Sequence, residues 1–352
     1  MKKLSRKRRQ WHDIHARKLN RRRIKKKKSR TRKHPQPSRS NPHRVHGSFT
    51  PIHCPEVLSL EDNFDGVVKL LDDIRMKSQK HRNKRIHIDF KPIRTIKPSA
   101  ALVLAAELDR WNRQLAIRNS KLVAVDAEEW DSTVRRLLRE MGFFKLLRVV
   151  SIPEEKSSTG IQYVQFCSGT KVDGKVIDDL RRLHLEPFVS VPNKHLLYAA
   201  VTEAMTNVVH HAYGDQTSLD VPKHWWLSAA YDGQSREVAV MIYDQGSGIP
   251  ATLPRKFKER IRELLPENLT KNDAHMIQAA HHLSRTATLS PSRGHGLQRD
   301  IRRYIEELDC HGMYRVISNR GEYIVETGAS SDKIISHKHP LSGTLIEWRL
   351  KQ

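Results

Sequence analysis

The chain of 352 residues lacks the features that mark exported, membrane-spanning or zinc-binding proteins. Its three cysteines, Cys54, Cys167 and Cys310, lie far apart and form no C-x-x-C pair, which favours a reducing compartment. The longest apolar run, Ala100 to Ala106, is far shorter than the about 20 residues that a membrane-spanning helix needs. The basic N-terminus has no apolar core of a secretory signal. We therefore expect a cytoplasmic protein with no membrane partner.

Two familiar nucleotide-binding sequences are also missing. The chain contains neither G-x-x-x-x-G-K nor G-x-G-x-x-G, which excludes a P-loop protein and a Rossmann domain. Its 20 histidines include the adjacent pairs His210-His211 and His281-His282, but neighbours in sequence diverge around a helix axis. No zinc site on a helix is therefore expected.

Acidic residues are almost absent from the first 50 positions. This stretch holds 20 Lys or Arg against the single acid Asp13, so that it carries +19 of the formal +25 charge. Like charges at this density repel one another, and they predict a disordered basic arm over residues 1–53. Neutralising phosphates releases counterions, so residues 1–50 favour nucleic acid as a partner. A merely solubilising tail remains the alternative.

Helical and strand periods alternate over residues 54–170. An apolar helical face covers 64–74, alternation typical of a strand covers 85–90, and an alanine- and leucine-rich helix covers 99–115. A short strand at 121–125 and an amphipathic helix at 130–141 follow. Strands separated by helices predict a small α/β domain with parallel pairing. A linker is expected over 171–190.

The stretch from Ile86 to Leu102 resembles the STAS domain of anti-sigma-factor antagonists, in which a strand leads through a short loop into a helix. The family's loop reads D-S-S-G, and here Lys97-Pro-Ser99-Ala100 takes its place, without the acid and the glycine. The resemblance implies that Ser99 is a phosphoacceptor. Its position before an alanine run equally suits a helix N-cap, whose hydroxyl accepts a backbone N–H bond.

An acid and an amide interrupt the apolar face of a helix predicted over 193–213. Glu203 and Asn207 are four residues apart and therefore share one face. Such polar groups need partners when they are buried.

Two strands follow, at 225–231 and 237–243, joined through Asp232-Gly233, which favours a hairpin. The second strand leads into Asp244-Gln-Gly246-Ser-Gly248, which taken alone is equally typical of an ordinary Asp/Gly turn.

A second glycine-rich string follows a stretch, 251–292, with helical segments and no clear strand. Arg293-Gly294-His295-Gly296-Leu297 opens a helix predicted over 298–308, where backbone amides at the positive end of the helix can hold phosphate oxygens. Residues 313–318 and 322–326 predict a hairpin around 319–321. Gly343-Thr344 precedes a last strand at 345–350, and a plain turn is the alternative interpretation of this pair.

The order of these strings resembles the GHKL superfamily of gyrase-type ATPases, heat-shock chaperones and histidine or anti-sigma kinases. The resemblance implies an α/β sandwich over residues 191–352, with a mixed sheet and helices on one face. It implies ATP and Mg²⁺ as cofactors, with Asn207 on the metal and Glu203 activating the attacking water or hydroxyl. Asp244 then accepts the adenine amino group. The remaining implied nucleotide contacts are Gly246, Gly248, Arg293, Gly294, His295, Gly296, Leu297 and Thr344.

Three activities fit such a domain. The STAS-like segment favours a regulatory serine kinase or ATPase of the anti-sigma type, acting on a protein phosphoacceptor or regulatory partner. The arm favours an ATP-gated nucleic-acid switch with slow or no hydrolysis. A histidine kinase is third, because no paired helices with a phosphoaccepting histidine precede the ATP domain. Formation of a homodimer stays open.

Overall fold

The computed structural model describes most of the chain after the basic arm. The described residues are 51–80, 85–117, 121–149, 160–187, 193–213, 223–253, 265, 269, 272–286, 302–307 and 310–351. Residues 49–352 form one unit. The predictions for the arm and for residues 293–297 lie outside the described residues.

Short parallel strands and helices make up an N-terminal layer. Strands β1, β3 and β5 form one parallel sheet, and β2 and β4 form another. This confirms the predicted α/β pattern with parallel pairing. The elements are β1 (Ile52–His53), β2 (Val57–Leu58), α2 (Phe64–Lys80), β3 (Arg85–Asp89), β4 (Thr95–Ile96), α3 (Pro98–Ile117), β5 (Lys121–Val125), η1 (Ala127–Glu129), α4 (Ser132–Glu140) and α5 (Phe143–Leu147).

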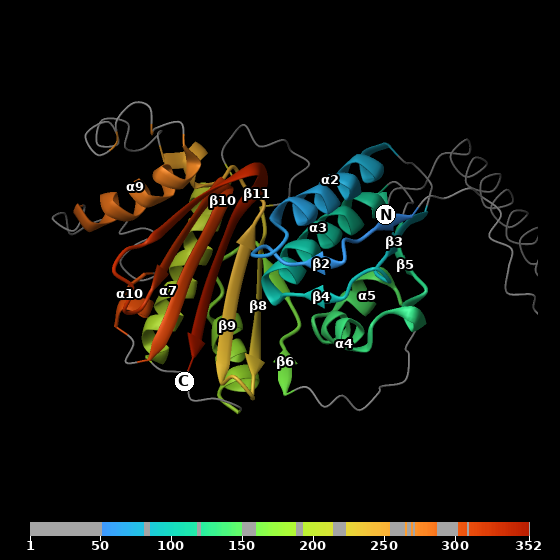
Figure 1. Cartoon of the computed structure of the whole chain (residues 1–352), viewed down its shortest axis with the longest axis horizontal. Helices are drawn as coiled ribbons and strands as arrows, with labels where there is room; N and C mark the ends of the chain where they lie inside the picture. Colours follow the sequence, from blue (N-terminus) through green and yellow to red (C-terminus); the bar gives the residue numbers. More distant parts are fainter. Residues whose placement is uncertain are drawn as a thin grey trace, which may run out of the picture. The chain divides into compact units, whose positions relative to one another are not determined.

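A larger sheet in the order β10-β11-β9-β8-β6 forms the centre of the C-terminal part (Figure 1). Its strands are β6 (Ile161–Tyr163), β7 (Cys167–Gly169), β8 (Trp225–Asp232), β9 (Glu237–Asp244), β10 (His311–Glu326) and β11 (Lys333–Lys351). Every described pair in it is antiparallel, so the expectation of a mixed sheet is wrong for this part of the chain. Short turns join β8 to β9 and β10 to β11, and such turns can connect only antiparallel neighbours.

The segment between the two layers is built into the sheet. Strands β6 and β7 precede the expected linker, and both pair with β8. The stretch 171–190 contains α6 (Gly174–Asp179) and the π-helix η2 (Leu180–Leu185). Ile177 of α6 and Leu185 of η2 are buried in the same core as the sheet.

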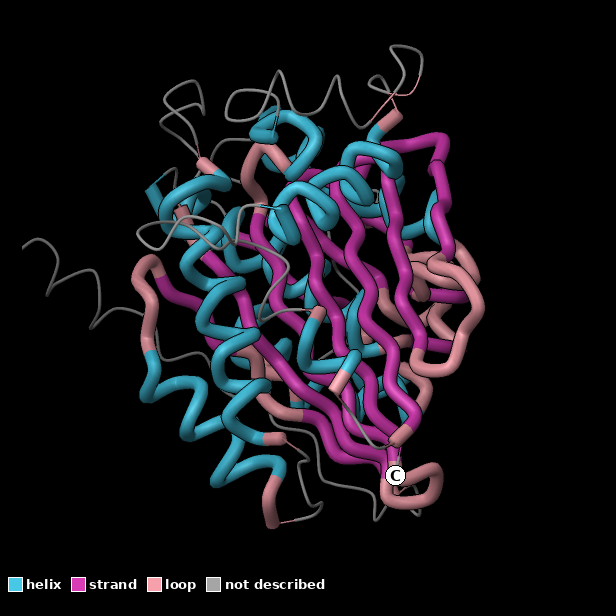
Figure 2. Tube along the Cα trace, turned by 90° about the vertical axis from the view of Figure 1, so that its left-hand side faces the viewer, coloured by secondary structure: helices cyan, strands magenta, loops and turns pink. Residues whose placement is uncertain are grey.

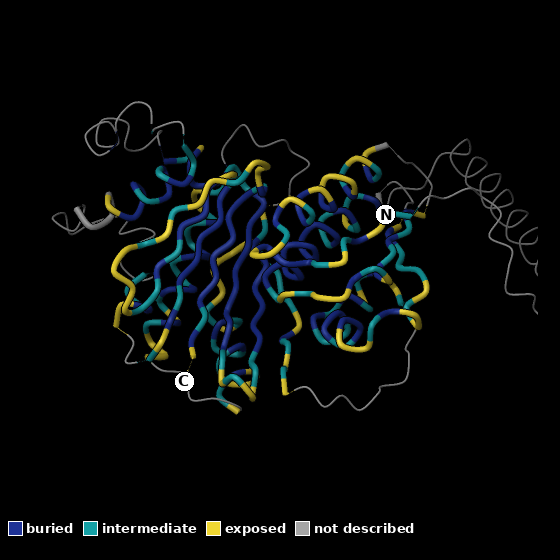
Figure 3. Tube along the Cα trace, viewed as in Figure 1, coloured by how far each residue is buried: buried dark blue, intermediate teal, exposed yellow. Residues whose placement is uncertain are grey.

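Both faces of the large sheet are buried (Figure 3). On β9, Val240 and Ile242 join a core with α7 (Lys194–Asn207), the π-helix η3 (Val208–Ala212), α9 (Asp273–Thr286) and α10 (Arg303–Glu306). Met241 and Tyr243 point the other way, into a core shared with α2 and α3. Figure 2 shows the long strands with helices lying over them. The alternation of side chains along a strand therefore places the sheet between two helical layers.

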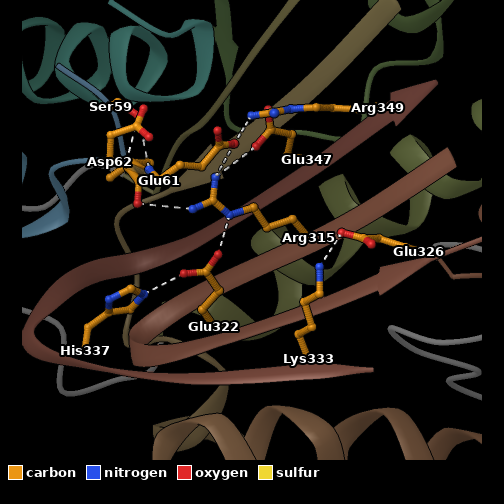
Figure 4. A network of polar contacts seen from close by, with 11 residues as sticks. Ser59, Glu61, Asp62, Arg315, Glu322, Glu326, Lys333, His337, Glu347 and Arg349 are labelled. Carbon is orange, nitrogen blue, oxygen red and sulfur yellow. Dashed lines mark hydrogen bonds and ion pairs between the residues drawn. The ribbon is translucent and has the colours of Figure 1, made fainter. Parts of the chain in front are cut away.

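A buried ionic network crosses the contact between the N-terminal layer and the sheet (Figure 4). The Arg315 guanidinium, 2% exposed, bonds Glu322 through Nε at 2.6 Å and Glu61 through Nη1 at 3.1 Å. Arg349 bonds Glu61 and, at 2.8 Å, Glu347. Glu61 precedes α2 whereas the other residues lie on β10 and β11, so these charges join parts of the chain that are far apart in sequence.

The hairpin predicted around residues 319–321 is wrong. Residues 311–326 form the single strand β10, which pairs with β11 along both halves. The register shifts between Ser318 and Asn319 and again between Asn319 and Gly321, and Asn319 adopts a positive φ of 53°. This is a bulge. The turn signal of Asn-Arg-Gly is overridden because β11 is long enough to pair with β10 on both sides of it.

No described helix is both long and apolar enough to cross a membrane.

Candidate functional site

Three strands end or bulge at the same place in the large sheet. Thr344 of β11 lies between Asp244 of β9 and Ser318 of β10 in the sheet register. Gly343 precedes Thr344, and Gly248 lies against Ser318. We call Asp244, Gly248, Ser318, Gly343 and Thr344 the strand-end cluster. It brings together Asp244 and Thr344, two predicted nucleotide contacts that are 100 residues apart in the sequence.

Gly343 allows the closest approach in the cluster. Its φ is +85°, and a Cβ there would lie 1.9 Å from the carbonyl oxygen of Asp244. Residues with a side chain rarely adopt such dihedrals, and here there is also no space for one. The predicted Gly-Thr pair therefore lies at an irregularity inside β11 and not in a turn before it.

Ser318 is a buried serine that our sequence reasoning did not select. Its hydroxyl donates to the Gly343 carbonyl at 3.0 Å and accepts from the Ile249 amide at 2.9 Å. It also lies 3.0 Å from the Thr344 hydroxyl. The signal in the sequence was a small polar residue at the end of the predicted strand 313–318. Ser318 thus connects the glycine-rich loop after β9 to the bulge of β11.

Asp244 is the titratable member of the cluster. The residue is 4% exposed, and its Oδ1 accepts from the Gly246 amide at 2.7 Å. Burial raises the pKa of its carboxyl to about 7, against the lowering effect of backbone hydrogen bonds from Gly246 and Thr344. Among the described residues no cation pairs with it. The carboxyl can therefore accept a further hydrogen bond from a neutral donor such as an amino group of a ligand.

The π-helix η3, which directly follows α7, rests on the loop that follows Asp244. The Ser247 amide donates to the Ala212 carbonyl at 2.8 Å, and a Cβ on Gly246 would lie 2.3 Å from the same oxygen. Gly246 therefore permits a close contact between the loop and η3. The helical turn at this contact has π geometry, which is frequent at functional sites.

Glu203 and Asn207 lie on α7, one turn apart, as predicted. Asn207 is the residue from which η3 begins, and the far end of η3, Ala212, contacts the glycine-rich loop. The Nδ2 atom of Asn207 is buried and has no hydrogen-bond partner among the described residues. A buried amide without a partner has an energetic cost, and a ligand in the site could supply the missing contact.

Ser99 lies apart from the strand-end cluster, in the first turn of α3. It is 1% exposed, and its hydroxyl has no hydrogen-bond partner in the described part of the chain. The hydroxyl therefore does not act as an N-cap in this structure. A kinase would reach it only after the start of α3 opened.

The other predicted phosphate contacts, residues 293–297, lie outside the described residues. Within the described ranges, no three His, Cys, Asp or Glu side chains gather as a metal site. Comparison of the chain with protein-family models, with curated proteins and with solved structures finds no match.

Proposed function

We propose that this chain binds Mg²⁺-ATP at the strand-end cluster, as a regulatory ATPase or protein serine kinase of the GHKL type. The observation that carries the proposal is the buried Asp244 carboxyl, which among the described residues has backbone partners only and lies beside Gly246 and Gly343, where backbone atoms fill the place of a side chain. An adenine offers an amino donor for such a carboxyl. For the fold, we propose a STAS-like layer that is followed along the chain by a GHKL-type sandwich.

The direction of the hydrogen bond supports adenine over guanine. The exocyclic amino group of adenine donates, and the Asp244 carboxyl accepts. Guanine presents a carbonyl at the corresponding position, and the ionised form of the Asp244 carboxyl has no donor for it. A base that leaves a buried polar group of the site without a hydrogen-bond partner binds much more weakly than one that supplies the partner. Thr344, hydrogen-bonded to Ser318, then lies beside Asp244 on the next strand.

In this proposal α7 supplies the groups that act on the phosphates. The Asn207 side-chain oxygen would hold Mg²⁺, and Glu203 would activate the attacking water or hydroxyl. The backbone amides of residues 294 and 296, which lie outside the described residues, would hold phosphate oxygens. Magnesium keeps several of its waters and takes few protein ligands, so a single amide on α7 is compatible with such a site.

Calorimetric titration of the purified chain with Mg²⁺-ATP tests the proposal. Asp244→Asn turns one acceptor oxygen into a donor, and we expect ATP affinity to fall about 10- to 100-fold, the effect of losing one hydrogen bond to a charged group. Asp232→Asn is the matched control, because Asp232 caps the turn at the opposite end of β9. Equal ATP affinity in wild type and Asp244→Asn would show that the site is assigned wrongly.

Radiolabelled γ-phosphate ATP separates the two activities. Label transferred to this chain or to an added partner protein indicates a serine kinase. Release of free phosphate alone indicates an ATPase, and tight binding with neither product indicates a nucleotide-gated switch.

A further inference from the structure

Glu107 is a carboxylate buried where α3 packs against the large sheet. It is 0% exposed and lies in the middle of α3. A carboxylate in such a place is costly unless all of its acceptor positions are used. Its partners therefore indicate what it is there to hold.

Four donors surround the Glu107 carboxylate. Oε1 accepts from Arg75 Nε at 2.9 Å and from Trp111 Nε1 at 2.7 Å. Oε2 accepts from Arg75 Nη2 at 3.1 Å and from Gln245 Nε2 at 2.8 Å. Arg75 and Trp111 belong to the N-terminal layer. Gln245 belongs to the glycine-rich loop and directly follows Asp244.

Arg75 extends the same contact to the other side of the strand-end cluster. Its Nη1 donates to the Ser342 hydroxyl at 3.0 Å, and Ser342 directly precedes Gly343. The Tyr243 hydroxyl donates to the Ser342 carbonyl at 2.6 Å. The Glu107 carboxylate outweighs the effect of burial and raises the pKa of the Arg75 guanidinium. One ion pair of the N-terminal layer thus holds both backbone segments that carry Asp244 and Thr344.

We propose that Glu107, held by Arg75, is a positioning residue for the nucleotide base, so that packing of α2 and α3 on the sheet and nucleotide binding are linked. The proposal rests on the function proposed above and adds its regulation. Any partner or modification that shifts α2 or α3 then alters nucleotide affinity. By thermodynamic reciprocity, bound nucleotide stabilises the packed N-terminal layer to the same extent.

Glu107→Gln is the direct test, because all four partners are donors. A glutamine at this position brings its own NH₂ against at least one of them, so that a contact with Arg75 or Gln245 is lost. We expect ATP affinity to fall about 5- to 150-fold, the usual range of coupling between sites, and the preference for ATP over GTP to shrink. A purely structural role would lower stability and leave base preference unchanged.

Exchanging the two groups provides a rescue. Gln245→Glu alone sets two carboxylates against each other and should weaken ATP binding. The double variant Glu107→Gln with Gln245→Glu restores a donor–acceptor pair, so ATP affinity and base preference should recover. If Glu107→Gln does not fold, Gln245→Met removes the same hydrogen bond and leaves Arg75 and Trp111 on Glu107.

Asp109→Asn is the matched control. Asp109 lies two residues further along α3 and accepts from Trp226 of β8 at 3.0 Å, so it joins the same helix to the same sheet without reaching residues 244–248 or 342–344. ATP affinity and base preference should be unchanged in this variant.

Titration of the full chain with ATP and GTP separates the failure of this inference from failure of the proposed function. If wild type binds no ATP, or if Asp244→Asn binds it equally well, the proposed function is wrong and the linkage falls with it. If ATP binding requires Asp244 but Glu107→Gln and Gln245→Met keep wild-type affinity and base preference, the linkage alone is overturned. Equal losses in Glu107→Gln and Asp109→Asn overturn it as well.

Discussion

Two glycines with similar positive φ angles differ in what surrounds them. Gly343 has φ +85° and lies against the backbone of Asp244, whereas Gly328 has φ +77° and has no atom within 4 Å of the place a Cβ would take. The pair separates the two reasons for which a protein keeps glycine, dihedral freedom and close approach.

We expect Gly343→Ala to be far more damaging than Gly328→Ala. The change at Gly328 costs about 1–2 kcal/mol, because only the left-handed backbone is strained. The change at Gly343 adds a clash with the Asp244 carbonyl and should remove ATP binding along with stability. Urea denaturation and ATP titration of both variants test this. Equal destabilisation by the two substitutions would mean that Gly343 does not lie close to the Asp244 carbonyl.

The Asp244 carboxyl should make stability depend on pH. Its folded pKa of about 7 lies above the value of 3.8 for an exposed aspartate, so the folded state binds the proton more tightly than the unfolded state. The free energy of unfolding therefore falls as the pH rises from about 4 to 7. Asp244→Asn should remove this loss, and its stability relative to wild type should increase over that range by on the order of a few kcal/mol. A difference that stays constant between pH 4 and pH 8 argues against a raised pKa.

At the scale of elements, α3 and α4 begin differently. Asp131 caps α4, and its carboxylate accepts from the amides of Thr133 and Val134 at 2.9 and 3.1 Å. Ser99 of α3 makes no such bond in the described structure. A serine before an alanine run is a good cap in principle, but α3 begins one residue earlier, at Pro98.

We therefore expect Ser99→Ala to change the free energy of unfolding by less than about 1 kcal/mol, because it removes a buried hydroxyl that has no partner. Asp131→Ala should lower it by about 1 kcal/mol, the usual cost of losing a cap. Chemical denaturation of both variants makes the comparison. A loss at Ser99 as large as that at Asp131 would show that its hydroxyl has a partner. Phosphopeptide mapping after incubation with Mg²⁺-ATP separately tests Ser99 as a phosphoacceptor.

At the scale of the whole molecule, the N-terminal layer and the large sheet share one core. Trp226 and Tyr243 of the sheet are buried together with residues of α2 and α3. The Arg315 network and the Glu107 cluster add polar contacts across the same boundary. The layer is therefore part of the structure that carries the strand-end cluster, and nucleotide binding should be studied on the chain with this layer present.

The basic arm supports a prediction about nucleic acid. If residues 1–50 contact about six to ten phosphates, affinity for a labelled DNA duplex should fall about 10³- to 10⁵-fold between 50 and 200 mM salt. Removal of residues 1–50 should abolish DNA binding and leave ATP affinity unchanged, because the strand-end cluster lies within residues 49–352. Fluorescence anisotropy measures the first and calorimetry the second. DNA binding that ignores salt, or that survives the truncation, would rule out the arm as the main contact.

Local pattern was enough for the elements whose sequence repeats with a clear period. The strand at 121–125 and the helix around 99–115 were predicted closely, since alternation and helical spacing are properties of neighbouring residues. The face shared by Glu203 and Asn207 follows from helical spacing in the same way. The sequence also selected Asp244, Gly246, Gly248 and Thr344 before their neighbours in space were known.

Only the tertiary structure decided which distant segments meet. Pairing with the long β11 turned the expected hairpin of residues 313–326 into one bulged strand, and pairing with β8 drew β6 and β7 into the large sheet. The contact of Glu107 with Gln245 spans 138 residues, and no local period encodes it. Such contacts depend on the summed packing of the whole core, whereas helices and strands are indicated by the residues within a few positions of each other.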